Sequence, residues 1–353
     1  MLDVGVDLHK RYSQVARLDE WGELRQQRVE HGEGGMEKFL RELEPASRIA
    51  VEATGNWWWF VDLAEGLGHR VTMSDPRQTQ AIAGACFKYD AADAERLVEL
   101  LKLGYLPCVW IPPAPLRYAK EVMRYRGLLV RMRTGLRNHL RGMLRKRNLT
   151  PTMKGLWTEA GRAYMGQVEL NADADRIRRE ALGLLNSLDE RIGHWDQELK
   201  RRVEKDPLTE RLMTAPGVGA QTAFGFRTFV GEIERFANPK KLSSYFGLVP
   251  RERSSGDKRR LGHITKAGDG LMRHLLVEAA LMASRKPGPL REYYRRMLRH
   301  KGKAKTRVAL AHRLVTVLYW MWKKNLDYRQ YLQGEARQAG EPVGSAGRAG
   351  PKL

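Results

Sequence analysis

The segment 88–97 sets two aspartates, Asp90 and Asp93, three residues apart at the start of an apolar stretch with helical spacing. On a helix, side chains at positions i and i+3 have Cβ atoms about 5–6 Å apart, so the two carboxylates could share a hard divalent cation such as Mg²⁺. Acidic pairs in a first helical turn usually only complement the helix dipole. Further carboxylates must therefore decide whether this pair belongs to a metal site.

Two more carboxylates stand in apolar strand patterns, because Asp7 ends the stretch 2–7 and Glu52 follows an apolar triplet. An ionised carboxylate in such a strand is costly unless it has a partner. Taken singly, each acid has an ordinary explanation: Asp7 could pair with Lys10 or Arg11, and Glu52 could lie next to the N-cap of the following helix. Taken together, the acids predict a site for Mg²⁺ or Mn²⁺ that could stabilise the attacking and leaving oxygens of a phosphoryl transfer. Its ligands would be Asp7, Glu52, Asp90 and Asp93.

Residues 1–110 alternate strand and helix patterns. Strands are predicted at 2–7, 12–18, 24–30, 48–53 and 69–74, and helices at 34–43 and 56–66, before the helix that Asp90 opens. The resulting order β-β-β-α-β-α-β-α is the plan of a ribonuclease H-like domain. The first and fourth strands are neighbours in such a sheet, so we expect Asp7 and Glu52 to lie side by side.

A second chemical candidate is the polar segment 245–268, where cations surround a Ser-Ser-Gly turn. A Ser-Gly pair in a loop is usually only a turn. Six cations around one serine, however, could hold a phosphodiester and stabilise the charge that builds up when the hydroxyl attacks it. These cations are Arg251, Arg253, Lys258, Arg259, Arg260 and Lys266.

A long helical hairpin is predicted at 111–206, after the prolines at 112–115. Its first helix, 116–147, would span about 48 Å, and both helices show the 3/4 spacing of a coiled-coil seam. The two seams are Val122, Tyr125, Leu129, Met132, Leu136, His139 and Met143, and Ile177, Ala181, Leu184, Leu188, Ile192, Trp195, Leu199 and Val203. The arginines on the other faces of the first helix could simply be solvated. Since they have almost no local acids, we expect a phosphate-binding rod that includes Arg131, Arg133 and Arg137 and that joins protomers into a dimer or tetramer.

The segment 212–223 predicts a helix-hairpin-helix within a mostly helical C-terminal domain, 207–332. The backbone N–H groups at Gly217 and Gly219 could approach a phosphate at the N-terminus of the second helix. A Gly-rich turn between helices is ordinary by itself, but the basic surroundings favour backbone contact. The Gly-, Ala- and Arg-rich residues 333–353 are expected to be a disordered tail.

The charge of the chain, +22 over 353 residues, predicts a polyanionic partner. Residues 1–105 carry 13 Lys and Arg against 18 Asp and Glu, whereas residues 116–149 carry 11 against one and residues 251–353 carry 24 against eight. No segment has the about 18–20 apolar residues that cross a bilayer, so a cytoplasmic location is expected. Cys86 and Cys108 lack metal-ligand spacing, which argues against a disulfide framework and a zinc site.

Several of these blocks resemble one family. Residues 4–10 (VGVDLHK), 51–55 (VEATG) and 88–94 (KYDAADA) are similar to the three blocks of the RuvC-like domain in DEDD-type insertion-sequence transposases. This family includes the Piv invertase and the bridge-RNA-guided recombinases, and Tyr89 departs from the Thr or Asn expected there. The segment 245–268 resembles the second domain of the same family. The resemblance implies Ser255 as nucleophile, with Ser254 less favoured, and a structured guide RNA beside DNA.

The predicted function is that of a DNA transposase or recombinase that cuts and rejoins strands through a covalent phosphoserine at the bacterial nucleoid. A structure-selective endonuclease of the Holliday junction resolvase type would use the acids with water and would not need the serine. An actin-like or sugar-kinase ATPase also begins with Val-Gly-Val-Asp, but no second Gly-rich phosphate loop follows. A non-catalytic nucleic-acid scaffold leaves the acids in the strands unexplained. A covalent protein–DNA adduct separates the first possibility from the others.

Overall fold

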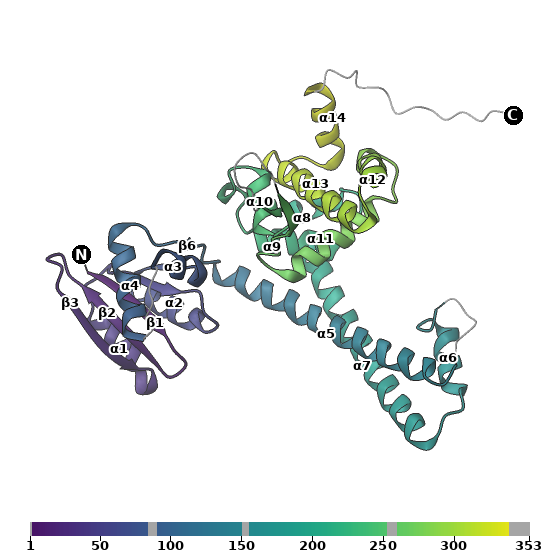
Figure 1. The fold of residues 1–353 in the computed structure, drawn as a ribbon, viewed down its shortest axis with the longest axis horizontal. Helices are drawn as coiled ribbons and strands as arrows, with labels where there is room; N and C mark the ends of the chain where they lie inside the picture. Colours follow the sequence, from purple (N-terminus) through teal and green to yellow (C-terminus); the bar gives the residue numbers. More distant parts are fainter. Residues whose placement is uncertain (1, 84–89, 150–154, 253–259, 339–353) are drawn as a thin grey trace. The chain divides into compact units, whose positions relative to one another are not determined.

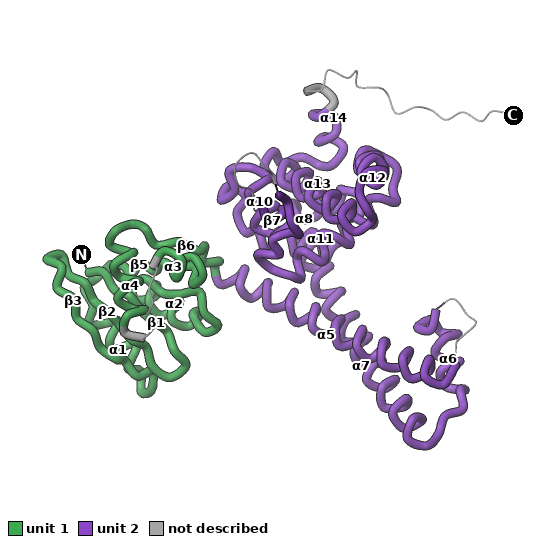
Figure 2. The backbone as a smooth tube through the Cα atoms, in the orientation of Figure 1, with its two compact units in different colours: residues 1–113 green, residues 114–353 purple. Residues whose placement is uncertain are grey.

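The structure, a computed structural model, describes residues 2–83, 90–149, 155–252 and 260–338 of the chain. The chain forms two compact units, residues 1–113 and residues 114–353 (Figure 2). The boundary between them falls in the proline segment at 112–115. No helix in the described ranges is both long enough and apolar enough to cross a membrane.

The N-terminal unit is a sheet covered by helices. Its strands are β1 (Asp3–Leu8), β2 (Tyr12–Leu18), β3 (Leu24–Glu30), β4 (Arg48–Glu52), β5 (Arg70–Ser74) and β6 (Cys108–Val109). Its helices are η1 (Gly32–Gly34), α1 (Gly35–Glu42), α2 (Trp57–Gly66), α3 (Pro76–Ala83) and α4 (Asp90–Leu103). The sheet order is β3-β2-β1-β4-β5-β6, with β1, β4 and β5 parallel and the other neighbours antiparallel (Figure 1). The predicted strands and helices occur in the predicted order, with the unpredicted α3 and β6 in addition, and β1 and β4 are neighbours.

One face of this sheet carries the larger apolar side chains. Val4 and Val6 of β1 and Val51 of β4 pack with Leu40 of α1 and Phe60 of α2, and all five are buried. The strand alternation that the sequence shows thus assigns this face to the main core of the unit.

The opposite face carries small residues and is covered by α4. Ala94 and Val98 of α4 pack on Ala16 of β2. A Cβ atom at Gly5 of β1 would lie 2.0 Å from the carbonyl oxygen of Ala94 and 2.8 Å from the backbone nitrogen of Val98. The backbone of α4 therefore rests directly on the backbone of β1, which only glycine at position 5 permits.

Replacing Gly5 with Ala is expected to destabilise the N-terminal unit by about 3 kcal/mol, because helix α4 must move away from the sheet to admit one methyl group. A loss of this size lowers the Tm by more than about 10 °C in a unit of this length. Thermal unfolding followed by circular dichroism measures it. Gly66→Ala is the matched control, since a Cβ atom there meets nothing within 4 Å. Equal melting of both variants would contradict the contact.

The described residues of the C-terminal unit are helical apart from one two-stranded ribbon (Figure 1). Its elements are α5 (Ala114–Arg145), α6 (Glu159–Gln167), α7 (Ala172–Glu204), α8 (Pro207–Met213), α9 (Ala220–Val230), η2 (Ile233–Arg235), α10 (Pro239–Tyr245), β7 (Pro250–Glu252), β8 (Leu261–Ile264), α11 (Gly270–Ala283), α12 (Pro289–His300), α13 (Lys303–Lys323) and α14 (Tyr328–Gln338). Met123 of α5 and Leu199 of α7 lie in the same core as Phe226 of α9 and Leu314 of α13. The long hairpin, predicted as a spacer, thus shares a core with the helices that follow it.

Helices α5 and α7 pack against each other, but the predicted seam is only partly buried. Leu129 of α5 packs on Leu188 and Ile192 of α7. In contrast, Tyr125 and Met132 of α5 are 44% and 51% exposed, and the seam residues Ile177 and Leu184 of α7 are also exposed. The seam fails because α5 changes partners along its length, from α9 at its start to α7 farther on, so no single stripe faces one helix throughout.

Candidate active site and nucleic-acid interface

Two of the predicted acids lie at the ends of neighbouring strands, on the same face of the sheet. Strands β1 and β4 pair in parallel register up to Val6 and Val51, the residues that precede Asp7 and Glu52. Because side chains alternate along a strand, both acids point to the face opposite these valines. That is the face covered by α4.

Helix α4 brings its acidic first turn toward the same end of the sheet. Near the end of α4, Lys102 Nζ donates a hydrogen bond of 2.9 Å to the carbonyl oxygen of Asp19, which lies at the edge of the sheet where β1 begins. The first turn of α4, with Asp90 and Asp93, therefore lies toward the end of β1, where Asp7 is. The side chain of Asp90 is outside the described part of the chain.

The donor chemistry of this corner fits a hard divalent cation, since carboxylate oxygens are the ligands that Mg²⁺ prefers. Asp7 is 15% exposed, and Asp93 forms an ion pair of 3.0 Å with Arg96 from the next turn of α4. Within the described residues, no group of three Asp, Glu, His or Cys side chains is arranged to bind a metal ion. The convergence of all four acids thus stays a prediction.

Two residues that were not predicted to belong to the site, His9 and Asn56, make contacts at this corner. His9 Nε2 lies 3.0 Å from Asp7 Oδ2, and the imidazole stacks on the ring of Tyr12 at 4.6 Å between centroids. Asn56, which precedes α2, donates a hydrogen bond of 2.8 Å to the carbonyl oxygen of His9. This bond ties the loop after β1 to the loop after β4. His9 lies just beyond the end of β1, so the alternation of the strand does not by itself predict this contact.

The segment with the predicted nucleophile connects the two strands of a short antiparallel ribbon, in which β7 pairs with β8. Ser254, Ser255, Arg253, Lys258 and Arg259 lie outside the described residues. The other predicted cations, Arg251, Arg260 and Lys266, are exposed on or next to the ribbon.

The base of this ribbon is fixed to α11 and α5. Arg273 of α11 donates to the carbonyl oxygens of Phe246 and Ala267, at 3.2 and 2.9 Å, on the two sides of the ribbon. Asp269 caps α11 and forms an ion pair of 3.1 Å with Arg124 of α5. The base of the ribbon is therefore tied to two helices by hydrogen bonds and an ion pair.

Lys120 of α5, close to the base of the ribbon, is a buried cation. Burial, together with the positive charges of Arg124 and Arg235, lowers the pKa of Lys120 to about 8. Its Nζ lies 5.6 Å from the centroid of the Phe229 ring. The lysine is still mostly protonated at neutral pH, so it adds to the positive potential of this part of the unit.

The predicted helix-hairpin-helix turn joins α8 and α9, and its two glycines differ in their surroundings. Gly217 has a φ of +81°, and a Cβ atom there would lie 2.1 Å from the carbonyl oxygen of Ala279 in α11. Close packing on α11 therefore explains this glycine without a phosphate. Gly219 is exposed at the N-terminus of α9, and a Cβ atom there meets nothing within 4 Å.

The first long helix has almost no acids of its own, but another helix supplies a partner for two of the three arginines that were predicted to bind phosphate. Arg133 and Arg137 of α5 both form ion pairs with Asp189 of α7, at 3.1 and 3.4 Å, and Arg162 of α6 joins them at 2.6 Å. Antiparallel packing brings in this acid from more than 50 positions away. Arg131 differs, because it is exposed and forms no ion pair with another described residue.

Replacing Asp189 with Asn is expected to lower the free energy of unfolding by about 2 kcal/mol at pH 7, since three half-buried guanidinium groups lose their shared carboxylate. Burial by itself raises the pKa of Asp189, but hydrogen bonds from Arg133 and Arg162 outweigh it and hold this pKa below the ordinary 3.8. Because the pKa of Asp189 is lower in the folded than in the unfolded state, its ionised carboxylate stabilises the fold at pH values above the unfolded-state pKa. This stabilisation is lost as the pH falls through the folded-state pKa.

Urea unfolding of wild type and Asp189→Asn, measured between pH 7 and pH 2, should show a difference in free energy that shrinks below about pH 4. The neighbouring exposed acid Glu190 supplies the control, because Glu190→Gln changes the same net charge without touching the cluster. A difference that does not depend on pH, or one that is equal in the control, would rule out the proposed role of Asp189.

Comparisons with known proteins agree with these features. A DEDD-type transposase model named for IS110 matches residues 4–148, and a model of the IS116/IS110/IS902 transposase family matches residues 209–295. A probable family 20 transposase of Pseudomonas aeruginosa is 28% identical over 92% of this chain and 98% of its own. The transposase for insertion sequence element IS1111A of Coxiella burnetii is 27% identical over 92% of this chain and 91% of its own.

Another relative, which matches over a shorter part of this chain, is named for inverting a gene. The pilin gene-inverting protein of Moraxella bovis is 28% identical over 44% of this chain and 53% of its own. The two family models cover the acidic blocks of the N-terminal unit and the serine segment of the C-terminal unit, in that order. The chain therefore belongs to the DEDD-type insertion-sequence transposases, enzymes that recombine DNA, and its N-terminal unit is the ribonuclease H-like domain of that family.

Proposed function

We propose that this transposase cuts and rejoins DNA through a covalent phosphoserine intermediate at Ser255, with a divalent metal ion held by Asp7, Glu52, Asp90 and Asp93. The observation that carries the proposal is the register of β1 and β4, which sets Asp7 and Glu52 on the face where α4 begins. Mg²⁺ is the expected ion, and Mn²⁺ would fit the same oxygen ligands.

A bound divalent ion would supply stabilisation of the charge that develops on the oxygens of the phosphodiester. The Ser255 hydroxyl oxygen forms a bond to phosphorus while the bond from phosphorus to the leaving oxygen breaks, and the leaving oxygen takes a proton. The number of ester bonds to phosphorus is unchanged, so the strand can be rejoined without ATP. The cations around the serine, of which Arg251 and Lys266 are exposed, would hold the phosphate.

The remaining cationic surface suits binding of DNA and, as the family resemblance implies, of a structured guide RNA. Arg131 is the arginine of α5 best placed for a phosphate contact among the three predicted, because Arg133 and Arg137 are engaged by Asp189. Such binding should weaken steeply with salt, by a slope of about −0.9 per neutralised phosphate of duplex DNA. A dimer or tetramer would let one copy supply the acids and another the serine.

The test is denaturing electrophoresis of a labelled DNA fragment that spans an end of the insertion sequence, incubated with the enzyme, its element's RNA and Mg²⁺. A labelled band that migrates with the protein and disappears after protease treatment is expected, and omission of the metal should remove it. Cleavage without any protein-linked product would instead favour a resolvase-type enzyme that uses water.

A further inference from the structure

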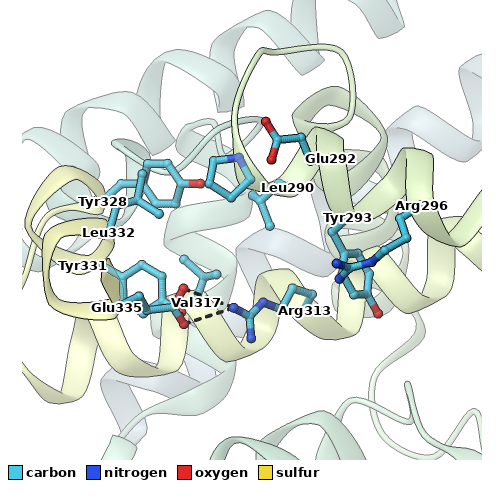
Figure 3. Close-up of a pocket in the computed structure, with 11 residues that line it drawn as sticks. Leu290, Glu292, Tyr293, Arg296, Arg313, Val317, Tyr328, Tyr331, Leu332 and Glu335 are labelled. Carbon is cyan, nitrogen blue, oxygen red and sulfur yellow. Dashed lines mark hydrogen bonds and ion pairs between the residues drawn. The ribbon is translucent and has the colours of Figure 1, made fainter. Parts of the chain in front are cut away.

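A pocket of about 370 Å³ lies where α12, α13 and α14 meet, away from the serine segment in the sequence (Figure 3). Its apolar floor is formed by Leu290 of α12, Val317 of α13 and Leu332 of α14. The volume is within the range of about 300–1,000 Å³ that is typical of small-molecule sites. No sequence pattern predicts this pocket, because its walls come from three separate segments, 289–296, 313–317 and 328–335.

One side of the pocket is held by a polar group that fixes α14 to α13. Arg313 Nη2 donates to both carboxylate oxygens of Glu335, at 3.0 and 3.2 Å, and the hydroxyl of Tyr331 donates to the same carboxylate (Figure 3). Because Arg313 is already engaged, its charge is not available to an anion in the pocket. The arrangement is therefore preorganised rather than closed by a ligand.

Two tyrosines from different helices offer aromatic surface to the pocket. Tyr328 of α14 and Tyr293 of α12 lie on opposite sides of it in this view, and both are partly exposed (Figure 3). Tyr328 stacks on Tyr331, with ring centroids 6.3 Å apart, and Arg296 lies 5.8 Å from the centroid of the Tyr293 ring. Flat rings of this kind are stacking surfaces for nucleobases.

The outer surface next to the pocket is strongly basic. Six exposed cations lie on α12, at the start of α13 and in the short connection between these helices, and none forms an ion pair with another described residue. They are Arg295, Arg296, Arg299, Lys301, Lys303 and Lys305. Exposed cations without an acidic partner provide sites for the phosphates of a nucleic-acid backbone.

We propose that this pocket binds an unpaired base of single-stranded nucleic acid, while the cations of α12 and α13 hold the adjoining phosphates. The proposal rests on the proposed function in so far as the enzyme must bind a nucleic acid that has unpaired nucleotides. The lining includes the exposed Glu292 and the carboxylate of Glu335, and carboxylates repel a phosphate but can accept hydrogen bonds from the amino groups of a base. A duplex is unsuitable, since its bases are already stacked and paired.

Binding measurements on the full chain can test this proposal. Fluorescence anisotropy would compare a 12-nucleotide RNA single strand, the same sequence as single-stranded DNA, and a blunt DNA duplex of equal length. Tyr293→Leu and Tyr328→Leu should each weaken single-strand binding about 10-fold, as expected when one base loses an aromatic stacking partner, and should leave duplex binding unchanged. Tyr118→Leu, at a 58% exposed tyrosine of α5, is the matched control.

A second measurement does not depend on the variants folding well. RNA containing 4-thiouridine, and DNA containing 4-thiothymidine, would be photocrosslinked to the wild-type enzyme and the attached peptides identified by mass spectrometry. Crosslinks within 289–296 or 328–335 support the pocket, and the more efficient strand identifies RNA or DNA as its ligand. Strong single-strand binding without a crosslink in these two segments would overturn the proposal. So would variants at Tyr293 and Tyr328 that weaken duplex binding as much as single-strand binding, or that behave like Tyr118→Leu. If wild type binds no nucleic acid at all, the proposed function fails first.

Discussion

Asp7→Asn is expected to lower the rate of DNA strand cleavage at least about 1,000-fold while leaving the N-terminal unit folded, because several kcal/mol of metal-derived stabilisation depends on this carboxylate. Asn keeps the shape of the side chain and can still contact His9, so the sheet has no reason to rearrange. Cleavage of labelled DNA, measured under single-turnover conditions with Mg²⁺, gives the rate. Circular dichroism melting gives the stability of the same preparation.

Asp3 provides a matched control on the same strand and the same face. Its side chain accepts two hydrogen bonds of 2.6 Å from Arg48 at the opposite end of β1, far from the first turn of α4. Asp3→Asn should lower the Tm but keep the cleavage rate of the folded enzyme. The metal site at Asp7 would be refuted by the opposite result, in which Asp7→Asn lowers the Tm and not the cleavage rate of the folded enzyme, or in which only Asp3→Asn stops cleavage.

Ser255→Ala is expected to abolish the covalent protein–DNA product, by at least about 1,000-fold, since no other hydroxyl can take the place of a positioned nucleophile. Ser254→Ala should retain the product, and the pair of variants separates two neighbouring serines of identical chemistry. Neither change should affect the melting temperature of the enzyme. Protease digestion and mass spectrometry of the adduct identify the modified serine directly.

Ser255→Ala and Asp7→Asn together show whether one protomer supplies both the acids and the serine of a site or two protomers share them. Mixing Ser255→Ala with Asp7→Asn protein restores activity only if a site can combine an intact serine from one protomer with intact acids from another. An adduct that survives in Ser255→Ala would falsify the assignment of the nucleophile. If the mixture stays inactive while the wild-type enzyme is active, the acids and the serine of one site come from the same chain.

Much of the N-terminal unit could be predicted because its signals are local. Strands 12–18 and 24–30 have the predicted bounds, since alternating apolar residues and the intervening turn define them without reference to the rest of the chain. The neighbouring positions of Asp7 and Glu52 followed from strand order alone. The contact of His9 with Asp7 did not, because it depends on how a loop folds back after β1.

The C-terminal unit was harder to predict because its contacts join distant segments. Helical spacing identified α5 and α7, but it could not show that Asp189 neutralises Arg133 and Arg137 or that Tyr125 remains exposed. Gly217 shows the same limit, since a glycine between helices fits a phosphate contact and a tight helix approach equally well. Only the position of α11 distinguishes them.

The cluster around Asp189 also has an evolutionary consequence. Loss of an ordinary surface acid removes one negative charge and changes nucleic-acid affinity only through that charge. Loss of Asp189 removes one negative charge and also releases three guanidinium groups, which could then bind phosphate. A single-base mutation at this codon could thus produce a transposase that binds nucleic acid less selectively and is also less stable. Selection against indiscriminate binding would act on the same residue as selection for folding, so the two pressures cannot be separated at this position.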